Sequence, residues 1–121
     1  MNKDIFVICQ QNKDKGIAKR ILVDKLEKFI VKNMNRDKCY IELIDGNKIY
    51  FMTDYELDIT YKGYRPYKYI RFSRKWLYKV LNSCYKRYKY LEDEKFYNLI
   101  IETLCEINKD KKWFKGENKN E

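Results

Sequence analysis

The chain has no histidine among its 121 residues, and it contains only one proline, one alanine and four glycines. Histidine supplies the base of most catalytic triads and many zinc ligands, so its absence argues against both kinds of site. The four cysteines, Cys9, Cys39, Cys84 and Cys105, form no Cys-x-x-Cys pair. We therefore expect free thiols, mostly small core residues, and neither a metal site nor a cofactor.

Long apolar runs are lacking as well. The run Ile5 to Cys9 spans only five residues, whereas the core of a secretory signal needs roughly 7–15. No stretch approaches the ~18 apolar residues of a membrane span. We expect a soluble, cytoplasmic protein that forms one domain over residues 1–115, followed by a flexible tail at 116–121.

The hydrophobic pattern predicts a mixed α/β fold. Apolar residues recur at steps of three and four from Ile17 to Met34, which is typical of an amphipathic helix. The tripeptide Asp45-Gly46-Asn47 suits a hairpin turn, and Ser73 is a good N-cap. The predicted elements are strands at 4–9, 39–44, 48–53 and 67–72, and helices at 16–34, 73–90 and from 93 onward.

This order, β-α-β-β-β-α-α, indicates a single small domain. The long helix between the first strand and the hairpin suits a crossover connection, so the sheet should be mixed and covered by helices. Residues 54–66 contain no clear periodic element, and we expect a loop there.

Positive charge is concentrated in one segment. The formal net charge is +9, yet the 33 residues from 59 to 91 contain ten cations, ten aromatics and no acidic residue. The rest of the chain is close to neutral. Such a segment is typical of a surface that contacts phosphate backbones and stacks on unpaired bases.

The candidate binding residues belong to the predicted strand 67–72, to the loop before it and to the helix after it. On that helix, residues 75, 78, 79, 82, 85, 86 and 89 share one face. The candidates are Lys62, Arg65, Lys68, Arg71, Arg74, Lys75, Tyr78, Lys79, Tyr85, Lys86 and Lys89.

The basic, tyrosine-rich segment 59–91 is compatible with several kinds of partner. Nucleic acid or a nucleoprotein fits the basic, tyrosine-rich segment, and so does an acidic protein, because tyrosine and arginine are enriched at protein interfaces. Small size and a composition typical of AT-rich genes suit a phage or mobile-element accessory protein. That class includes an anti-CRISPR-like inhibitor of a host defence complex, acting by protein–protein contact. Self-assembly through the same surface is a third possibility.

Enzymatic activity has weaker candidates. Asp54, Glu56 and Asp58 alternate, so on a strand they would share a face and could bind Mg²⁺ as in a metal-dependent nuclease. The same residues also serve as ordinary solubilising acids. Serine occurs only at Ser73 and Ser83, without a histidine partner. We expect a non-enzymatic protein.

Residues 4 to about 72 resemble, in layout, small phage and terminase-type P-loop proteins. The first strand, a polar loop, a long helix and a hairpin precede a last strand within Lys62 to Phe72. Laid on Cys9 to Gly16, the pattern G-x-x-x-x-G-K-[ST] matches Lys15, but Cys9, Asp14 and Gly16 depart from both glycines and the hydroxyl. The resemblance therefore implies a degenerate, non-hydrolysing phosphate loop.

Overall fold

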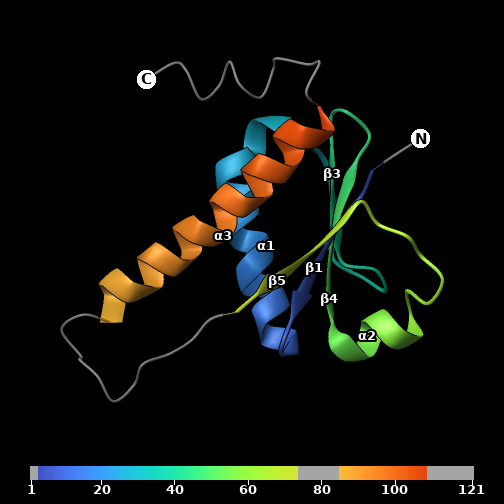
Figure 1. Cartoon of the computed structure of the whole chain (residues 1–121), viewed down its shortest axis with the longest axis horizontal. Helices are drawn as coiled ribbons and strands as arrows, with labels where there is room; N and C mark the ends of the chain where they lie inside the picture. Colours follow the sequence, from blue (N-terminus) through green and yellow to red (C-terminus); the bar gives the residue numbers. More distant parts are fainter. Residues whose placement is uncertain (1–2, 74–84, 109–121) are drawn as a thin grey trace.

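The computed structural model describes residues 3–73 and 85–108, with side chains described for 3–73 and 93–108 (Figure 1). The elements are, in chain order, β1 (Ile5–Cys9), α1 (Asn12–Leu26), a 3₁₀ turn (Glu27–Phe29), β2 (Ile30–Met34), β3 (Tyr40–Leu43), β4 (Lys48–Thr53), α2 (Asp54–Ile59), β5 (Lys68–Phe72) and α3 (Tyr85–Ile107). None of the helices within these described ranges has the length and apolarity needed to cross a membrane.

The five strands form one mixed sheet in the order β2-β3-β4-β1-β5. β1 lies between β4 and β5 and runs parallel to both, so that Val7 stands opposite Phe51 on one side and Ile70 on the other. β2, β3 and β4 form an antiparallel meander. This confirms the α/β class and the mixed sheet.

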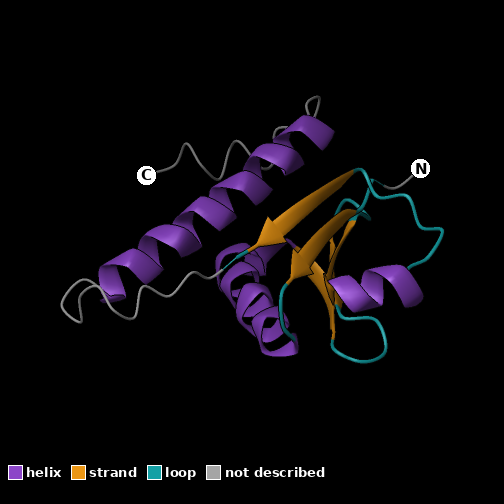
Figure 2. Cartoon of the chain, turned by 60° about the horizontal axis from the view of Figure 1, so that its bottom comes forward, coloured by secondary structure: helices purple, strands orange, loops and turns teal. Residues whose placement is uncertain are grey.

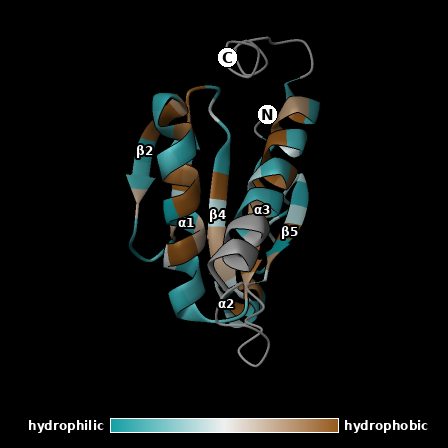
Figure 3. Ribbon diagram, turned by 90° about the vertical axis from the view of Figure 1, so that its left-hand side faces the viewer, coloured by the Kyte–Doolittle hydropathy of each residue, from teal (hydrophilic) through white to brown (hydrophobic). Residues whose placement is uncertain are grey.

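The face formed by Ile5, Val7 and Cys9 of β1 is covered by α1 and α3 (Figures 2 and 3). Leu22 of α1 and Ile100 of α3 are fully buried against it. Burying each such aliphatic side chain stabilises the fold by roughly 1.5–3 kcal/mol. This layer is the main core because its cluster of buried residues is the larger of the two.

The opposite face of the sheet has a smaller cover. Among the described helices, Figure 2 shows α2 on this side and α1 and α3 on the other, and the second core cluster packs beneath α2 and the loop that follows it. The buried members of this cluster are Phe6, Ile8, Tyr50, Met52 and Tyr61. Within residues 3–73 and 85–108, a six-residue helix and a loop cover this face, and Tyr64 and Tyr69 on it are exposed.

The predicted helix at 16–34 is wrong at both ends. α1 begins at Asn12 and ends at Leu26, and Ile30–Met34 forms the edge strand β2 instead. Residues four apart, such as Ile30 and Met34, share a face in a helix and in a strand alike. The spacing therefore did not separate the two structures, and pairing with β3 decided for the strand.

The loop expected at 54–66 begins with a helix. Thr53 caps α2: the Glu56 amide donates to Thr53 Oγ1 over 3.3 Å, and the Thr53 amide donates to Glu56 Oε1 over 3.0 Å. This Thr-x-x-Glu capping box was visible in the sequence. The rest of the loop turns at Gly63, whose φ of +90° favours glycine.

Near the C-terminus, one helix replaces the expected break at residue 93. α3 is continuous from Tyr85 to Ile107, and no glycine or proline interrupts it. The first part of the helix predicted at 73–90, residues 74–84, lies outside the described residues. So does the predicted tail 116–121. The hairpin is confirmed, with Gly46 in its turn at a φ of +90°.

Candidate functional site

Four of the predicted binding residues have described side chains. Lys62 and Arg65 are exposed in the loop between α2 and β5, Arg71 is exposed on β5, and Lys68 is half-buried there. Strand alternation places Lys68 and Arg71 on opposite faces. These four cations therefore do not form a single basic plane.

The remaining candidates cannot be placed by their side chains. Arg74, Lys75, Tyr78 and Lys79 lie outside the described residues. Tyr85, Lys86 and Lys89 belong to the first turns of α3, in a part of the helix where only the backbone is described. The basic helix face predicted from these residues stays a prediction.

Arg71 is neutralised by a neighbouring acid. Its Nη2 lies 3.0 Å from Oδ1 of Asp54, and hydrogen bonding from Arg71 lowers the pKa of the Asp54 carboxyl. Lys62 and Arg65, in contrast, form no ion pair with any acid among residues 3–73 and 93–108. Their charge is available to an external anion.

Six aromatic side chains gather on the sparsely covered face of the sheet, and we call this cluster the tyrosine face. Neighbouring ring centroids lie 5.4 Å apart for Phe6 and Tyr61 and 5.8 Å apart for Phe6 and Tyr69, both edge-to-face. Its members are Phe6, Tyr40, Tyr50, Tyr61, Tyr64 and Tyr69. Such contacts hold the rings in fixed orientations.

Exposure differs sharply across the tyrosine face. Phe6 is 1% exposed and Tyr61 is 3% exposed, whereas Tyr64 is 39% and Tyr69 is 55% exposed. Burial raises the pKa of Tyr50 to about 12, and it raises the pKa of Tyr61 as well, so both phenols stay neutral. The buried rings form a rigid base, and Tyr64 and Tyr69 present ring surface to solvent.

Two lysines outside the predicted segment join this surface. Lys38 Nζ lies 4.7 Å from the ring centroid of Tyr64 and donates a hydrogen bond to its hydroxyl. Lys48 Nζ lies 5.8 Å from the ring centroid of Tyr40. Neither lysine was predicted from the sequence, although Lys48 and Tyr50 are two residues apart on β4 and therefore share a face.

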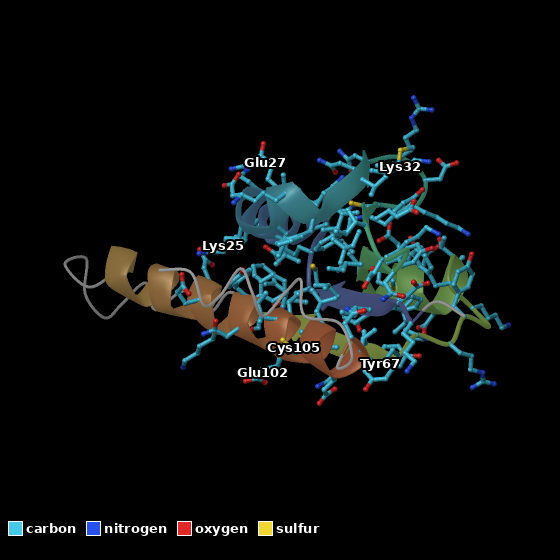
Figure 4. All side chains as sticks on the ribbon, turned by 90° about the horizontal axis from the view of Figure 1, so that it is seen from above. Lys25, Glu27, Lys32, Tyr67, Glu102 and Cys105 are labelled. Carbon is cyan, nitrogen blue, oxygen red and sulfur yellow. The ribbon has the colours of Figure 1, made fainter. Side chains whose placement is uncertain are left out.

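Tyr67 lies apart from the tyrosine face. Its hydroxyl donates to Glu106 Oε1 over 3.3 Å, and Figure 4 shows Tyr67 beside the C-terminal half of α3. Lys3 Nζ lies 5.5 Å from the centre of its ring. Tyr67 therefore connects β5 to α3.

The proposed magnesium face of Asp54, Glu56 and Asp58 does not form. These residues belong to α2, where positions two apart point in different directions. Glu56 binds Lys15 over 2.9 Å, and Asp54 binds Arg71. Within residues 3–73 and 93–108, no group of three histidine, cysteine, aspartate or glutamate side chains is arranged to hold a metal ion.

The thiols with described surroundings are free. Cys9 and Cys39 are buried, and Cys105 is half-buried. Burial raises the pKa of Cys9 to about 12 and also raises that of Cys39, so neither forms a reactive thiolate near neutral pH. The expectation of small core cysteines is confirmed for these two residues.

Lys15, the single residue that matches the phosphate-loop lysine, lies in the first turn of α1 and is bound to Glu56. The resemblance to P-loop proteins stays a prediction. The chain matches no family model, no curated protein and no solved structure.

Proposed function

We propose that this chain is a non-enzymatic binding protein that contacts nucleic acid or a nucleoprotein through residues 59–91. The observation that carries the proposal is the exposure of the Tyr64 and Tyr69 rings on the tyrosine face, together with the exposed, unpaired charges of Lys62 and Arg65 in the same loop as Tyr64. Cations release the counterions condensed on a phosphate backbone, and aromatic rings stack on bases.

The arrangement of charge supports the same function. Lys38 extends the cationic surface beyond residues 59–91, because it approaches the Tyr64 ring from the loop between β2 and β3. The acidic residues nearest to Arg71 and Lys15, in contrast, neutralise those two cations. Lys38 therefore adds positive charge beside Tyr64, where Arg71 and Lys15 add none.

Composition supports a setting in phage or mobile elements. Within this proposal, the chain acts as an accessory protein, including one that inhibits a host defence complex by occupying its nucleic-acid or nucleoprotein surface. A pull-down from cells, with and without nuclease treatment, separates a nucleic-acid partner from an acidic protein partner. Loss of the partner after nuclease treatment supports direct binding to nucleic acid.

The direct test measures fluorescence anisotropy of labelled RNA and DNA as salt is raised. Binding should weaken log-linearly with salt concentration. The double variant Lys62→Glu, Arg65→Glu should abolish binding while the circular dichroism spectrum is unchanged. The matched control is Lys13→Glu, Arg20→Glu, which changes two exposed cations on α1, behind the other face of the sheet.

A second variant addresses the part of the segment whose side chains are not described. Replacing Lys75, Lys79 and Lys86 by glutamate should also reduce binding, since the sequence predicts a helix on which these three residues share one face. If neither variant changes binding, or if no nucleic acid binds at low ionic strength, the proposal is wrong.

A further inference from the structure

We propose that the ligand of the tyrosine face is a single-stranded nucleic acid, with unpaired bases stacked on Tyr69 and Tyr64. This inference rests on the proposed function and narrows it to one class of ligand. The residues that carry it all have described side chains. It adds the tyrosine face to the helix face predicted from Lys75, Lys79 and Lys86 as a contact surface.

The geometry of Tyr69 is the first reason. Its ring lies edge-to-face with Phe6, at 5.8 Å between centroids and 88° between planes, and 55% of the residue is exposed. No hydrogen bond joins its hydroxyl to another residue among those described. Tyr69 is thus oriented by the core while its ring surface and hydroxyl are open to a ligand.

Tyr64 provides a second exposed ring, which also contacts Phe6. Its centroid lies 6.2 Å from that of Phe6 and 5.4 Å from that of Tyr61. Phe6 therefore contacts both exposed rings, and the two rings flank one buried phenylalanine. Two neighbouring aromatic surfaces of this kind suit successive bases of one strand.

Charge complementarity indicates where the phosphate backbone of the bound nucleic acid lies. Lys38 binds the Tyr64 hydroxyl, and Lys62 and Arg65 are exposed on either side of Tyr64 in the chain. At the other end of the face, Asp4 accepts from the Lys48 amide and Glu42 stands opposite Lys48. Phosphates are therefore favoured beside Tyr64 rather than beside the carboxylates of Asp4 and Glu42.

Duplex nucleic acid does not fit these features. In a duplex, the two faces of each base are covered by neighbouring base pairs, so exposed rings on a sheet find nothing to stack on. Duplex grooves admit helices or ribbons, whereas bases splayed from a single strand lie flat on aromatic side chains. The ring surfaces thus favour an unpaired strand.

The test compares four fluorescently labelled ligands of about 12 nucleotides: single-stranded RNA, single-stranded DNA, the DNA duplex and a DNA strand of abasic sites. We expect the two single strands to bind more tightly than the duplex. The abasic strand keeps its phosphates but has no bases to stack on either ring, so it should bind more weakly than Tyr69→Ala binds the intact strand.

The variants isolate stacking from charge. Tyr69→Ala should weaken single-strand binding about 5- to 150-fold, the range found for loss of one stacked base. Tyr69→Phe should retain most of the affinity. Because no charge is removed, Tyr69→Ala should leave the slope of affinity against salt unchanged. The control is Tyr55→Ala, which removes a 74% exposed tyrosine on α2 outside the tyrosine face.

The outcomes separate this inference from the proposed function. If the duplex and the abasic strand bind as tightly as the intact single strands, and Tyr69→Ala has no effect, the stacking inference is wrong. Binding to phosphates then remains in place. Absence of binding to all four ligands at about 50 mM salt overturns the proposed function itself. Selective loss of single-strand affinity in Tyr69→Ala supports both.

Discussion

Glu56 links three elements of the fold, which makes it a sharp test of the structure. Both of its carboxylate oxygens lie 2.9 Å from Lys15 Nζ, and Oε1 accepts from the Thr53 amide over 3.0 Å. The N-terminus of α1, the end of β4 and the start of α2 therefore meet at one carboxylate. Side-chain exposure is 17% for Lys15 and 28% for Glu56, so water only partly replaces these contacts.

Replacing Glu56 by alanine removes half of the capping box and leaves Lys15 without its anion. A charge-assisted hydrogen bond contributes about 1.5–3 kcal/mol, and loss of a cap costs about 1 kcal/mol. Because the two effects overlap, we expect the free energy of unfolding to fall by about 2–3 kcal/mol. For a chain of this length the corresponding decrease in Tm is roughly 10 °C.

The dependence on pH gives an independent check. Burial opposes ionisation of Glu56, but the hydrogen bonds from Lys15 and Thr53 outweigh it and lower the pKa below its ordinary value of 4.5. The carboxylate therefore adds stability above pH 4.5, and this stability is lost as the pH falls through the folded-state pKa. The difference between the wild type and Glu56→Gln should shrink in that range.

Urea denaturation followed by circular dichroism, at pH 7 and at pH 3, measures both effects. The control is Asp58→Ala, which removes an exposed acid from the same helix. A double-mutant cycle with Lys15→Met isolates the ion pair. If Glu56→Ala unfolds at the same urea concentration as Asp58→Ala, the assigned role of Glu56 is refuted.

Three further predictions follow from burial and backbone geometry. Leu104→Ala should lower the free energy of unfolding by about 2–5 kcal/mol in urea denaturation, because Leu104 is fully buried between α3 and the sheet. Gly63→Ala should lower it by about 1–2 kcal/mol, since alanine is strained at a φ of +90°; an unchanged midpoint would contradict that geometry. In thiol labelling at pH 8 with peptide mapping, Cys105 should react well before Cys9 and Cys39, and equal rates would contradict their burial.

The sequence predicted those elements whose signals are local. The apolar run Ile5–Cys9 forms β1, and the turn centred on Gly46 forms the hairpin because glycine readily adopts its positive φ. The strand β2 was not predictable from its own residues. Three of its five residues are exposed or polar on an edge of the sheet, and their conformation depends on pairing with β3.

The candidate site was predictable only where it depends on local sequence patterns. Alternation along β5 places Tyr69 and Arg71 on one face, but only the fold shows that Asp54 neutralises Arg71. The contribution of Lys38 to the site was equally hidden, because its contact with Tyr64 joins residues 26 positions apart. Long-range contacts of this kind depend on topology, which local sequence patterns do not specify.

The two faces of the sheet carry different side chains because different elements cover them. The face beneath α1 and α3 is filled by aliphatic residues such as Val7 and Ile70, which tolerate complete burial. Within the described part of the chain, α2 and a loop cover the other face, and there tyrosine can bury part of its ring while the rest contacts water, as the 39% and 55% exposure of Tyr64 and Tyr69 shows. The same compromise leaves Tyr69 structurally anchored by Phe6 and open to a ligand, so the residues that stabilise this face are also those that can bind.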